Sequence, residues 1–293
     1  MEEQKKYEHK LINGKIVAAE IRNNCASKVV RHRKETGKSP CLATVLVSDD
    51  SRSLNYIRMK HAQCHELGII TRHISLPITT TTATLVSTVE TLSEDPDVHG
   101  IFLQYPLPAQ INAYLAFNAI APEKDVDGLT VHSFGTMAYG ASGFQSCAAY
   151  GIMRLLATYG VNPKGSHAAV ITQNPAFGNP MCMLLLAGGA TVTYCQDRIQ
   201  DLPNHTGKAD IVVVAVNQPK LVRGAWIKKG AVVLDAGCNT GNIGDVDFHT
   251  AAVRASLIAP VPGGVGPVTI ALLLEQTADA AIQQRWRAPF NNL

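Results

Sequence analysis

Several features that mark particular classes of protein are missing from this sequence of 293 residues. The first ten residues, Met1 to Lys10, contain no apolar stretch of the kind that a secretory signal needs. No apolar run approaches the ~18 residues of a membrane span. Lys and Arg residues are dispersed along the chain, which argues against a nucleic-acid-binding protein. We therefore expect a cytoplasmic protein without a membrane or nucleic-acid partner.

Paired cysteines are also missing. The seven cysteines are an odd number, lie far apart and form no Cys-x-x-Cys pair. This spacing argues against both a disulfide framework and a structural zinc site. We expect buried, reduced thiols and no metal. The chain also lacks an internal repeat and a low-complexity tract.

The composition is that of a globular protein with a large core, since 46% of the residues are hydrophobic and 17% are charged. The length predicts two domains. Apolar runs alternate with segments of helical period, which is typical of parallel α/β units. Predicted strands cover Cys41–Val47, Ile69–Leu76, Gly100–Gln104, His167–Thr172, Thr191–Tyr194, Ile211–Val216 and Val232–Asp235, and predicted helices cover Ser51–Leu67, Ala83–Leu92 and Thr269–Gln284.

A stretch rich in Gly, Ala and Ser, from about Ala138 to Ser146, is the best candidate for a linker. The four predicted strands after it form a compact, doubly wound unit, which is the usual architecture for binding a dinucleotide.

The most informative segment runs from Asp50 to Lys60. Ser53, Tyr56 and Lys60 are three and four residues apart, so a helix places them on one face. A Tyr ring offers a flat surface to a planar heterocycle, and a desolvated Lys can donate or accept a proton near neutral pH. Taken alone, the segment is explained as well by an exposed helix whose Tyr and Lys face water.

Three other segments combine polar groups with rigid turns. Gln104 ends a buried strand just before Pro106 and Pro108, and ligands bind at the carboxyl ends of strands in α/β sheets. The turn Pro122–Gly128 supplies acidic residues. The loop Pro260–Thr269 is rich in glycine and opens a helix, so it allows a ligand to approach backbone N–H groups closely.

Together these segments resemble the methylenetetrahydrofolate dehydrogenase/cyclohydrolase family in the order and spacing of its motifs. The resemblance extends from about Leu11 to Ala281. The matching motifs are Ser53-x-x-Tyr56-x-x-x-Lys60, Gln104-x-Pro106-Leu107-Pro108, Lys124–Gly128, Ala209–Val216, Gly244–Phe248 and the highly specific Pro260–Pro267 loop.

The resemblance implies a two-domain α/β fold whose domains enclose a cleft. An α/β folate-binding catalytic domain would cover residues 1–147. Residues 269–293, which include the C-terminal helix, would return to this domain and complete it. A Rossmann-like domain would cover residues 148–268. The implied substrate is 5,10-methylenetetrahydrofolate, which NADP or NAD oxidises to the methenyl form before hydrolysis to 10-formyltetrahydrofolate. A homodimer through the second domain is also implied.

The resemblance also assigns roles to residues. Lys60 is the implied central catalytic group, and Gln104 tunes it by hydrogen bonding. Tyr56 would stack along the folate, and Asp127 would bind the polar edge of the pterin, because a carboxylate can accept two hydrogen bonds from an aminopyrimidinone. Further substrate-binding residues would be Ser53, Pro262, Gly263 and Gly264.

The nucleotide side departs from the family pattern. The usual Gly-Arg-Ser-x-x-Val-Gly-x-Pro loop reads here Thr172-Gln173-Asn174-Pro175-Ala176-Phe177-Gly178-Asn179-Pro180. Gly178 survives, and so does Pro180, which suits the first turn of the next helix. A β-branched Thr172 suits a tight turn and the close approach of a pyrophosphate poorly, and Gln173-Asn174 lack the positive charge of Arg-Ser.

Two further turns change. Cys195 is followed by Gln196-Asp197-Arg198, and Asp197 would repel a 2′-phosphate but suit the free ribose of NAD. The usual Val-Gly-Lys-Pro turn becomes Val216-Asn217-Gln218-Pro219, which loses a glycine. The candidate cofactor-binding residues are therefore Thr172, Gln173, Asn174, Gly178, Arg198 and Asn217.

These departures lead to three hypotheses. The first is a folate-dependent one-carbon enzyme with weakened or lost hydride transfer, either a cyclohydrolase or an enzyme that delivers the methylene carbon to a second small-molecule acceptor. The second is the ordinary bifunctional dehydrogenase/cyclohydrolase, because a helix N-terminus binds phosphate without a particular side chain. The third is a non-catalytic folate-binding paralogue, against which the retained Lys60 and Gln104 argue.

Overall fold

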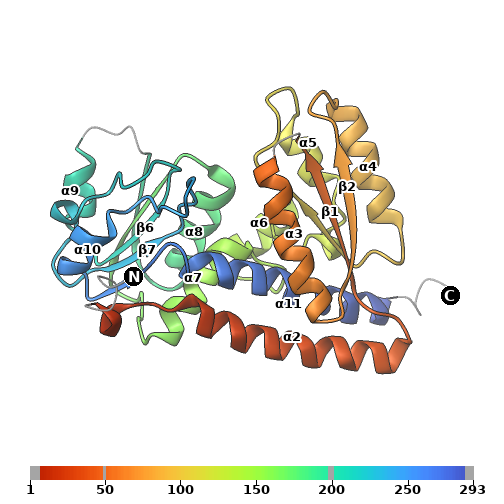
Figure 1. Cartoon of the computed structure of the whole chain (residues 1–293), viewed down its shortest axis with the longest axis horizontal. Helices are drawn as coiled ribbons and strands as arrows, with labels where there is room; N and C mark the ends of the chain where they lie inside the picture. Colours follow the sequence, from red (N-terminus) through yellow and green to blue (C-terminus); the bar gives the residue numbers. More distant parts are fainter. Residues whose placement is uncertain (1–6, 49–50, 197–200, 288–293) are drawn as a thin grey trace. The chain divides into compact units, whose positions relative to one another are not determined.

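The computed structural model describes residues 7–48, 51–196 and 201–287, with the side chains of residues 51–56 and 285–287 outside the description. The chain forms two compact units (Figure 1). The three-stranded unit comprises Glu20–Gln145 and the chain from Ile270 onward, and the five-stranded unit comprises the residues up to Ala19 and Ser146–Thr269. The helices α2 (Gly14–Thr36) and α11 (Val265–Arg287) contribute residues to both units.

In the three-stranded unit the strands lie in the order β2-β1-β3, and all are parallel. The central strand is buried along its whole length, as its mostly apolar sequence predicts for a strand covered on both faces, and Thr44 is its one polar residue. Apolar side chains of α4 and α5 complete the core of the unit, among them Leu85, Val89 and Phe117. Its elements are β1 (Cys41–Val47), α3 (Ser51–Glu66), β2 (Ile70–Leu76), α4 (Thr82–Glu94), β3 (Gly100–Leu103), α5 (Ala113–Asn118), η2 (Pro122–Lys124) and α6 (Val131–Ala138).

The five-stranded unit contains a parallel sheet in the order β5-β4-β6-β7-β8. This is a doubly wound order in which the chain switches direction between β4 and β6. Its elements are η1 (Glu8–Lys10), α7 (Cys147–Thr158), β4 (His167–Thr172), α8 (Pro175–Ala187), β5 (Thr191–Cys195), α9 (Leu202–Thr206), β6 (Ile211–Ala215), η3 (Gly224–Trp226), β7 (Val232–Asp235), α10 (Phe248–Arg254) and β8 (Leu257–Ala259).

The N-terminal segment joins the five-stranded unit through backbone hydrogen bonds. Leu11 forms a parallel bridge with Ile258 of β8, and the Ile12 N–H donates to the Ile258 carbonyl at 2.9 Å. These residues therefore belong to the five-stranded unit, whereas the predicted bounds, which stay a prediction, place 1–147 with 269–293 in one domain and 148–268 in the other. The predicted return of the C-terminal helix to the first domain is confirmed, since α11 belongs to the three-stranded unit from Ile270 onward.

The seven predicted strands agree with the structure to within one residue, but other elements differ from expectation, and several helices, among them α2, were not predicted. The sequence analysis missed β8, which has only three residues and so too short an apolar run to stand out. The last helix begins at Val265 rather than at Thr269. Pro180 lies inside α8 and not in its first turn, because the helix already begins at Pro175. The expectation for Pro180 was therefore wrong.

The helix α11 also bears on the predicted absence of a membrane span. Its segment Val265–Gln284 is long and apolar enough to cross a membrane by length and composition, which the search for apolar runs had not shown. In the structure 67% of its most apolar window is buried. The core helix of a globular protein passes the same test, so this segment is weak evidence for a membrane protein.

Candidate active site

Lys60 of α3 is a buried cation. Its side chain is 3% exposed, and its Nζ lies 3.6 Å from the centroid of the Phe102 ring on β3. The same Nζ donates a hydrogen bond to Gln104 Oε1 at 3.4 Å. The negative face of the ring and the amide oxygen both compensate for the loss of water around the ammonium. Lys60 therefore lies against the end of β3 and not in bulk solvent.

Gln104 is held in one orientation directly after β3. Its backbone N–H donates to the Val45 carbonyl at 2.9 Å, and its side-chain Nε2 donates to the Tyr105 carbonyl at 2.6 Å. Because Nε2 is occupied as a donor, Oε1 is left to accept from Lys60. The structure thus brings together the two residues for which the resemblance implies a shared catalytic role.

Asp127, the predicted pterin ligand, lies half-buried in the turn between η2 and α6. The neighbouring Asp125 organises this turn. It is fully buried and accepts hydrogen bonds from the backbone N–H groups of Leu129 (3.0 Å) and Thr130 (2.8 Å) and from Ser133 Oγ (2.6 Å). Asp125 therefore shapes the turn on which Asp127 lies, whereas pterin binding by Asp127 stays a prediction.

A second element fixes the same turn. Gln276 of α11 donates from Nε2 to the Val126 carbonyl at 2.8 Å and to the Gln145 carbonyl at 2.9 Å. Val126 in turn packs over Gly100, where an added Cβ would lie 2.8 Å from both valine methyl groups. Sequence reasoning missed Asp125 and Gln276 as supports of the site. The motif around Asp127 contained the signal for Asp125, whereas nothing near Gln276 in the sequence points to this turn.

The other folate-side residues fall into two groups. The side chains of Ser53 and Tyr56 lie outside the described residues, although both belong to α3. Pro262, Gly263 and Gly264 belong to the five-stranded unit. Lys60 belongs to the three-stranded unit, and a site that these residues share with Lys60 stays a prediction.

The glycines of the Pro260–Pro267 loop have a packing role within the five-stranded unit. Gly263 has a φ of +107°, which an L side chain rarely adopts, and its carbonyl accepts from the Gly14 N–H at 2.8 Å. A Cβ on Gly14 would overlap the Gly264 carbonyl. The N-terminus of α2 and the loop before α11 therefore meet backbone to backbone, which requires glycine at residue 14 as well as in the predicted motif.

The altered nucleotide loop forms a regular strand-to-helix turn. Thr172 is buried at the end of β4, lacks a positive φ, and its Oγ1 accepts from the Asn174 N–H at 3.1 Å. Asn174 caps α8, since its Oδ1 accepts from the Ala176 N–H at 3.0 Å. The expectation that a β-branched residue suits this tight turn poorly was therefore wrong, because the backbone here does not need a positive φ, whereas the expected hindrance to a pyrophosphate stays a prediction. Gln173 lies between these two residues.

Asn217 explains how the next turn tolerates the loss of a glycine. Its φ is +56°, in the left-handed region that asparagine adopts more readily than other non-glycine residues. The buried carboxylate of Asp245 accepts from the N–H groups of Val216 (2.6 Å), Asn217 (2.9 Å) and Gln218 (2.8 Å). The turn therefore keeps its shape. Arg198 lies outside the described residues.

These two turns fit a dinucleotide. They follow β4 and β6, the neighbouring strands between which the winding direction of the sheet changes, and dinucleotides bind at this position in doubly wound sheets. Gly178 in α8 packs so closely on Thr172 and Tyr194 that a Cβ would overlap both side chains. The glycine therefore brings the start of α8 close to the sheet, as in dinucleotide-binding folds. Compared with the family's usual loop, this turn lacks a positively charged side chain at residue 173.

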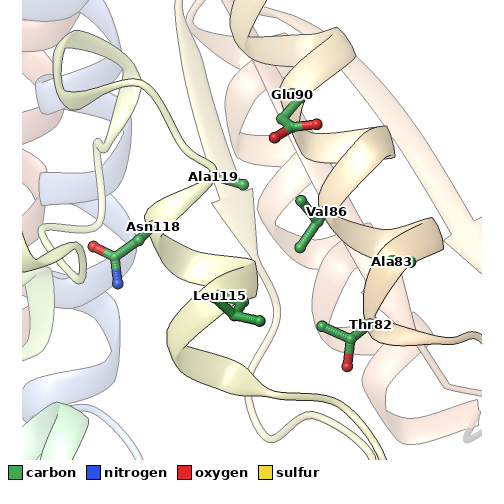
Figure 2. Close-up of a pocket in the computed structure, with 7 residues that line it drawn as sticks. All are labelled: Thr82, Ala83, Val86, Glu90, Leu115, Asn118 and Ala119. Carbon is green, nitrogen blue, oxygen red and sulfur yellow. The ribbon is translucent and has the colours of Figure 1, made fainter.

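Two of the cavities are lined by none of the predicted site residues. One, of about 520 Å³, opens between α4 and α5 and is drawn in Figure 2. Its lining is mostly apolar or neutral, with Glu90 as its one acidic residue, and contains none of the predicted site residues. The other, of about 170 Å³, lies in the five-stranded unit beside Asp235 and Gly244.

Five of the seven cysteines are buried, whereas Cys182 is half-buried and Cys238 is exposed, so the expectation of buried thiols is wrong for these two. Burial raises the pKa of Cys25 and of Cys64 to about 12, so these thiols stay protonated. In the part of the chain that the structure describes, no three His, Cys, Asp or Glu side chains gather in a group that could hold a metal ion.

The model of the tetrahydrofolate dehydrogenase/cyclohydrolase catalytic domain matches residues 12–127, and the model of the NAD(P)-binding domain of the same enzymes matches residues 146–285. The chain belongs to this family. Among curated relatives, Bifunctional protein FolD 1 of Streptomyces avermitilis is 55% identical over 274 residues, which are 94% of this chain and 96% of that protein. Bifunctional protein FolD of Shouchella clausii is 46% identical and covers 92% of this chain and 97% of its own length.

Solved structures of the family agree with the fold. The bifunctional FolD of Campylobacter jejuni superposes with a TM-score of 0.88 at 38% identity, covering 94% of this chain and 99% of that chain. The Trypanosoma brucei dehydrogenase-cyclohydrolase, solved with NADP and an inhibitor, gives a TM-score of 0.89 at 33% identity over 94% of this chain and 98% of that chain. The two-domain α/β fold is therefore confirmed, and the chain is a folate-dependent one-carbon enzyme of this family with an NAD(P)-binding domain.

The comparisons with curated relatives also bear on the three functional hypotheses. The curated relatives that share about half of its residues are named bifunctional proteins. This finding favours the ordinary bifunctional enzyme over the hypothesis of weakened or lost hydride transfer, which the altered loop alone had suggested. The regular geometry of that loop removes part of the reason for the earlier interpretation.

Proposed function

We propose that this chain is a bifunctional enzyme that oxidises 5,10-methylenetetrahydrofolate with a nicotinamide cofactor and hydrolyses the methenyl product to 10-formyltetrahydrofolate. The observation that carries the proposal is the buried Lys60 ammonium, held between the Phe102 ring and Gln104 Oε1. A folate-binding paralogue without activity has no use for a desolvated lysine at the end of a strand, because burying this charge is costly.

The residues of the three-stranded unit suit both steps. Lys60 Nζ would hold or release a proton at the folate, and Gln104 Oε1 would stabilise its charged form by accepting a hydrogen bond. In the hydrolytic step a water adds to the methenyl carbon, the π electrons of the carbon–nitrogen double bond return to nitrogen, and one water proton leaves to a base, for which the neutral form of Lys60 is the candidate. The bond between that carbon and N5 then breaks, N5 takes up a proton, and the carbon stays on N10 as the formyl group. Asp127 would bind the pterin edge. Tyr56 and Ser53, which belong to α3, would also contact the folate.

The residues of the five-stranded unit would hold the cofactor, which supplies a hydride acceptor when it is bound. Its phosphates would approach the start of α8, where Thr172, Gln173, Asn174 and Gly178 lie, and Asn217 would line the neighbouring turn. We also propose, from the family resemblance, that Arg198 contacts the cofactor. The same resemblance assigns folate contacts to Pro262, Gly263 and Gly264. The cofactor is NADP or NAD. We further propose a cytoplasmic homodimer, which sedimentation in solution would test.

The deciding experiment uses the purified protein with 5,10-methylenetetrahydrofolate, with and without NADP+ or NAD+. Absorbance follows the reduced cofactor and the methenyl product, and mass spectrometry identifies 10-formyltetrahydrofolate. Reduction of one cofactor in step with product formation supports the proposal. Hydrolysis of added methenyltetrahydrofolate without reduction of either cofactor would instead support a cyclohydrolase that has lost hydride transfer. Binding of folate without either reaction would support the silent paralogue.

The same mixtures test the acceptor hypothesis. If the methylene carbon is consumed only when an added amine is present, and neither cofactor is reduced, the enzyme transfers the carbon to a second substrate. The Lys60→Met variant is the control in every arm, because it removes the proposed proton-transferring group while keeping an apolar stem of similar length.

A further inference from the structure

Three side chains form a row across the three-stranded sheet at the level of Lys60. Thr44 on the central strand β1 is in register with His73 on β2 and with Phe102 on β3. Neighbours in register on adjacent strands project from the same face of a sheet. The row His73-Thr44-Phe102 therefore faces α3, and we call it the platform.

Two consecutive residues of α3 rest on the platform. Lys60 Nζ lies over the Phe102 ring at 3.6 Å, while His61 Nε2 lies 2.9 Å from Thr44 Oγ1. The Thr44 hydroxyl also lies 3.3 Å from His73 Nδ1, and the rings of His61 and His73 meet edge to face with centroids 5.6 Å apart. Consecutive helical residues point about 100° apart, so these two side chains fix the helix on both sides of β1.

We propose that His61 is a positioning residue for Lys60: its hydrogen bond to Thr44 sets the rotation of α3 about its axis and so keeps the Lys60 ammonium at Gln104. The inference rests on the proposed function only for its effect on turnover, because the geometry can be tested without substrate.

The environment of the histidine supports this role. Thr44 is fully buried, so its hydroxyl needs partners inside the protein, and its third neighbour is the Arg72 carbonyl at 3.3 Å. Burial, together with electrostatic interactions with His73 and Lys60, lowers the pKa of His61. The imidazole is therefore neutral near pH 7 and adds no second cation beside Lys60. Rotation of the helix would cost the His61–Thr44 bond and the Lys60–Gln104 bond together.

The test compares variants on the two sides of this bond. His61→Ala and Thr44→Val remove it, whereas His61→Gln and Thr44→Ser each keep a polar atom for it. His65→Ala is the matched control, because His65 is an exposed histidine one turn further along the same helix. Turnover of the proposed cyclohydrolase step should fall about tenfold to a hundredfold in the first pair, since small displacements of a catalytic group have effects of this size. The KM for the folate should change little, and the second pair should recover most of the loss.

A labelling experiment tests the geometry independently of activity. Isotope-coded acetylation of lysines, read by mass spectrometry, should modify Lys60 slowly in the wild type and several-fold faster in His61→Ala and Thr44→Val. Lys124 is the internal control, because it is buried in the same unit (6% exposed) but donates to the carbonyls of Leu92 and Asp95, away from the platform. Its labelling should stay unchanged.

Each outcome is decisive. Faster labelling of Lys60 alone, with lower turnover, supports a positioning role. Equal acceleration at Lys60 and Lys124 would show general loosening of the unit, and unchanged labelling of Lys60 would show that the histidine does not hold the helix; either result overturns the proposal. If the wild type has no folate activity, the proposed function fails, but the labelling result still stands for or against His61.

Discussion

The hydroxyl of Tyr194 on β5 lies so close to Gly178 of α8 that a Cβ at residue 178 would overlap it. The methyl group of Thr172 lies against the same glycine, at 2.7 Å from such a Cβ. Gly178 therefore stays in the altered loop for a steric reason, independent of any side chain that binds the cofactor.

We expect Gly178→Ala to destabilise the five-stranded unit by about 1–3 kcal/mol, the usual cost of overpacking. Tyr194 is partly exposed and can move aside, whereas Thr172 is fixed at the end of β4. Adding Tyr194→Ala should therefore recover only part of the loss, and adding Thr172→Ser should recover more. Urea unfolding of the single and double variants measures these couplings. Strict additivity would show that neither contact limits residue 178.

Lys60→Met should separate stability from activity. Replacing a buried cation by an apolar side chain of similar length is often neutral or stabilising, whereas removal of a group that transfers protons costs about two orders of magnitude or more in rate. We expect an unchanged or higher thermal midpoint and a cyclohydrolase rate at least about a hundredfold lower. A lower midpoint with retained activity would assign Lys60 a structural role.

Gly178→Ala concerns a contact that the sequence could not show, whereas Lys60→Met concerns a residue that the sequence did indicate. Lys60 and Gln104 belong to separate motifs, but the helix period and the strand end predicted where each would lie. The packing of Gly178 on Tyr194 depends on which residues of two different elements face each other, and a single sequence carries no such information. The same holds for Gln276, which reaches the Asp127 turn from far along the chain.

Backbone conformation explains the misjudged loop in the same way. A missing glycine is a defect where a neighbouring atom leaves no room for a Cβ, as at Gly178, or where the chain needs a positive φ. Residue 172 does not need one, and at residue 217 asparagine supplies it. Sequence reasoning identified the changes correctly but could not give the local φ values that decide their effect.

Asn217 should tolerate glycine but not a β-branched residue. Its φ of +56° strains Val by roughly 1–2 kcal/mol, whereas Gly adopts it freely. We expect Asn217→Val to lower the free energy of unfolding by about this amount and to weaken cofactor binding, and Asn217→Gly to do neither. Denaturant unfolding and calorimetric titration with NADP+ measure the two effects. Equal behaviour of the two variants would contradict the steric argument.

His99 should make the protein less stable in mild acid. Burial lowers the pKa of His99 to about 4, and its Nδ1 accepts a hydrogen bond from the Cys41 N–H at 3.1 Å. In the unfolded chain His99 therefore binds a proton near pH 6.5, whereas in the folded state it binds one only near pH 4. The contribution of neutral His99 to the free energy of unfolding is complete above pH 6.5. It is lost as the pH falls toward 4, by about 3 kcal/mol at most.

The variant His99→Gln isolates this effect, since its amide oxygen can still accept from Cys41. Its stability should depend less on pH between 6.5 and 4 than that of the wild type. The comparison is needed because burial raises the pKa of Asp235 to about 6, which makes the folded state more stable as the pH falls through part of the same range. Parallel pH profiles for the two proteins would show that His99 does not cause the slope.

Gln173→Arg should restore the positive charge that the family's cofactor loop carries at this position. The residue lies between the Thr172 and Asn174 groups that shape the turn, and neither of the hydrogen bonds recorded there involves its side chain. An added guanidinium can bind phosphate by charge-assisted hydrogen bonds. We expect calorimetric titration at low salt to show about tenfold tighter binding of NADP+, with a smaller gain for NAD+ and a loss of the difference at high salt. Asn162→Arg is the matched control, because it adds the same charge to the same unit in the loop before β4, at the other end of the sheet. If both variants gain equally, the effect comes from net charge, and residue 173 does not face the cofactor.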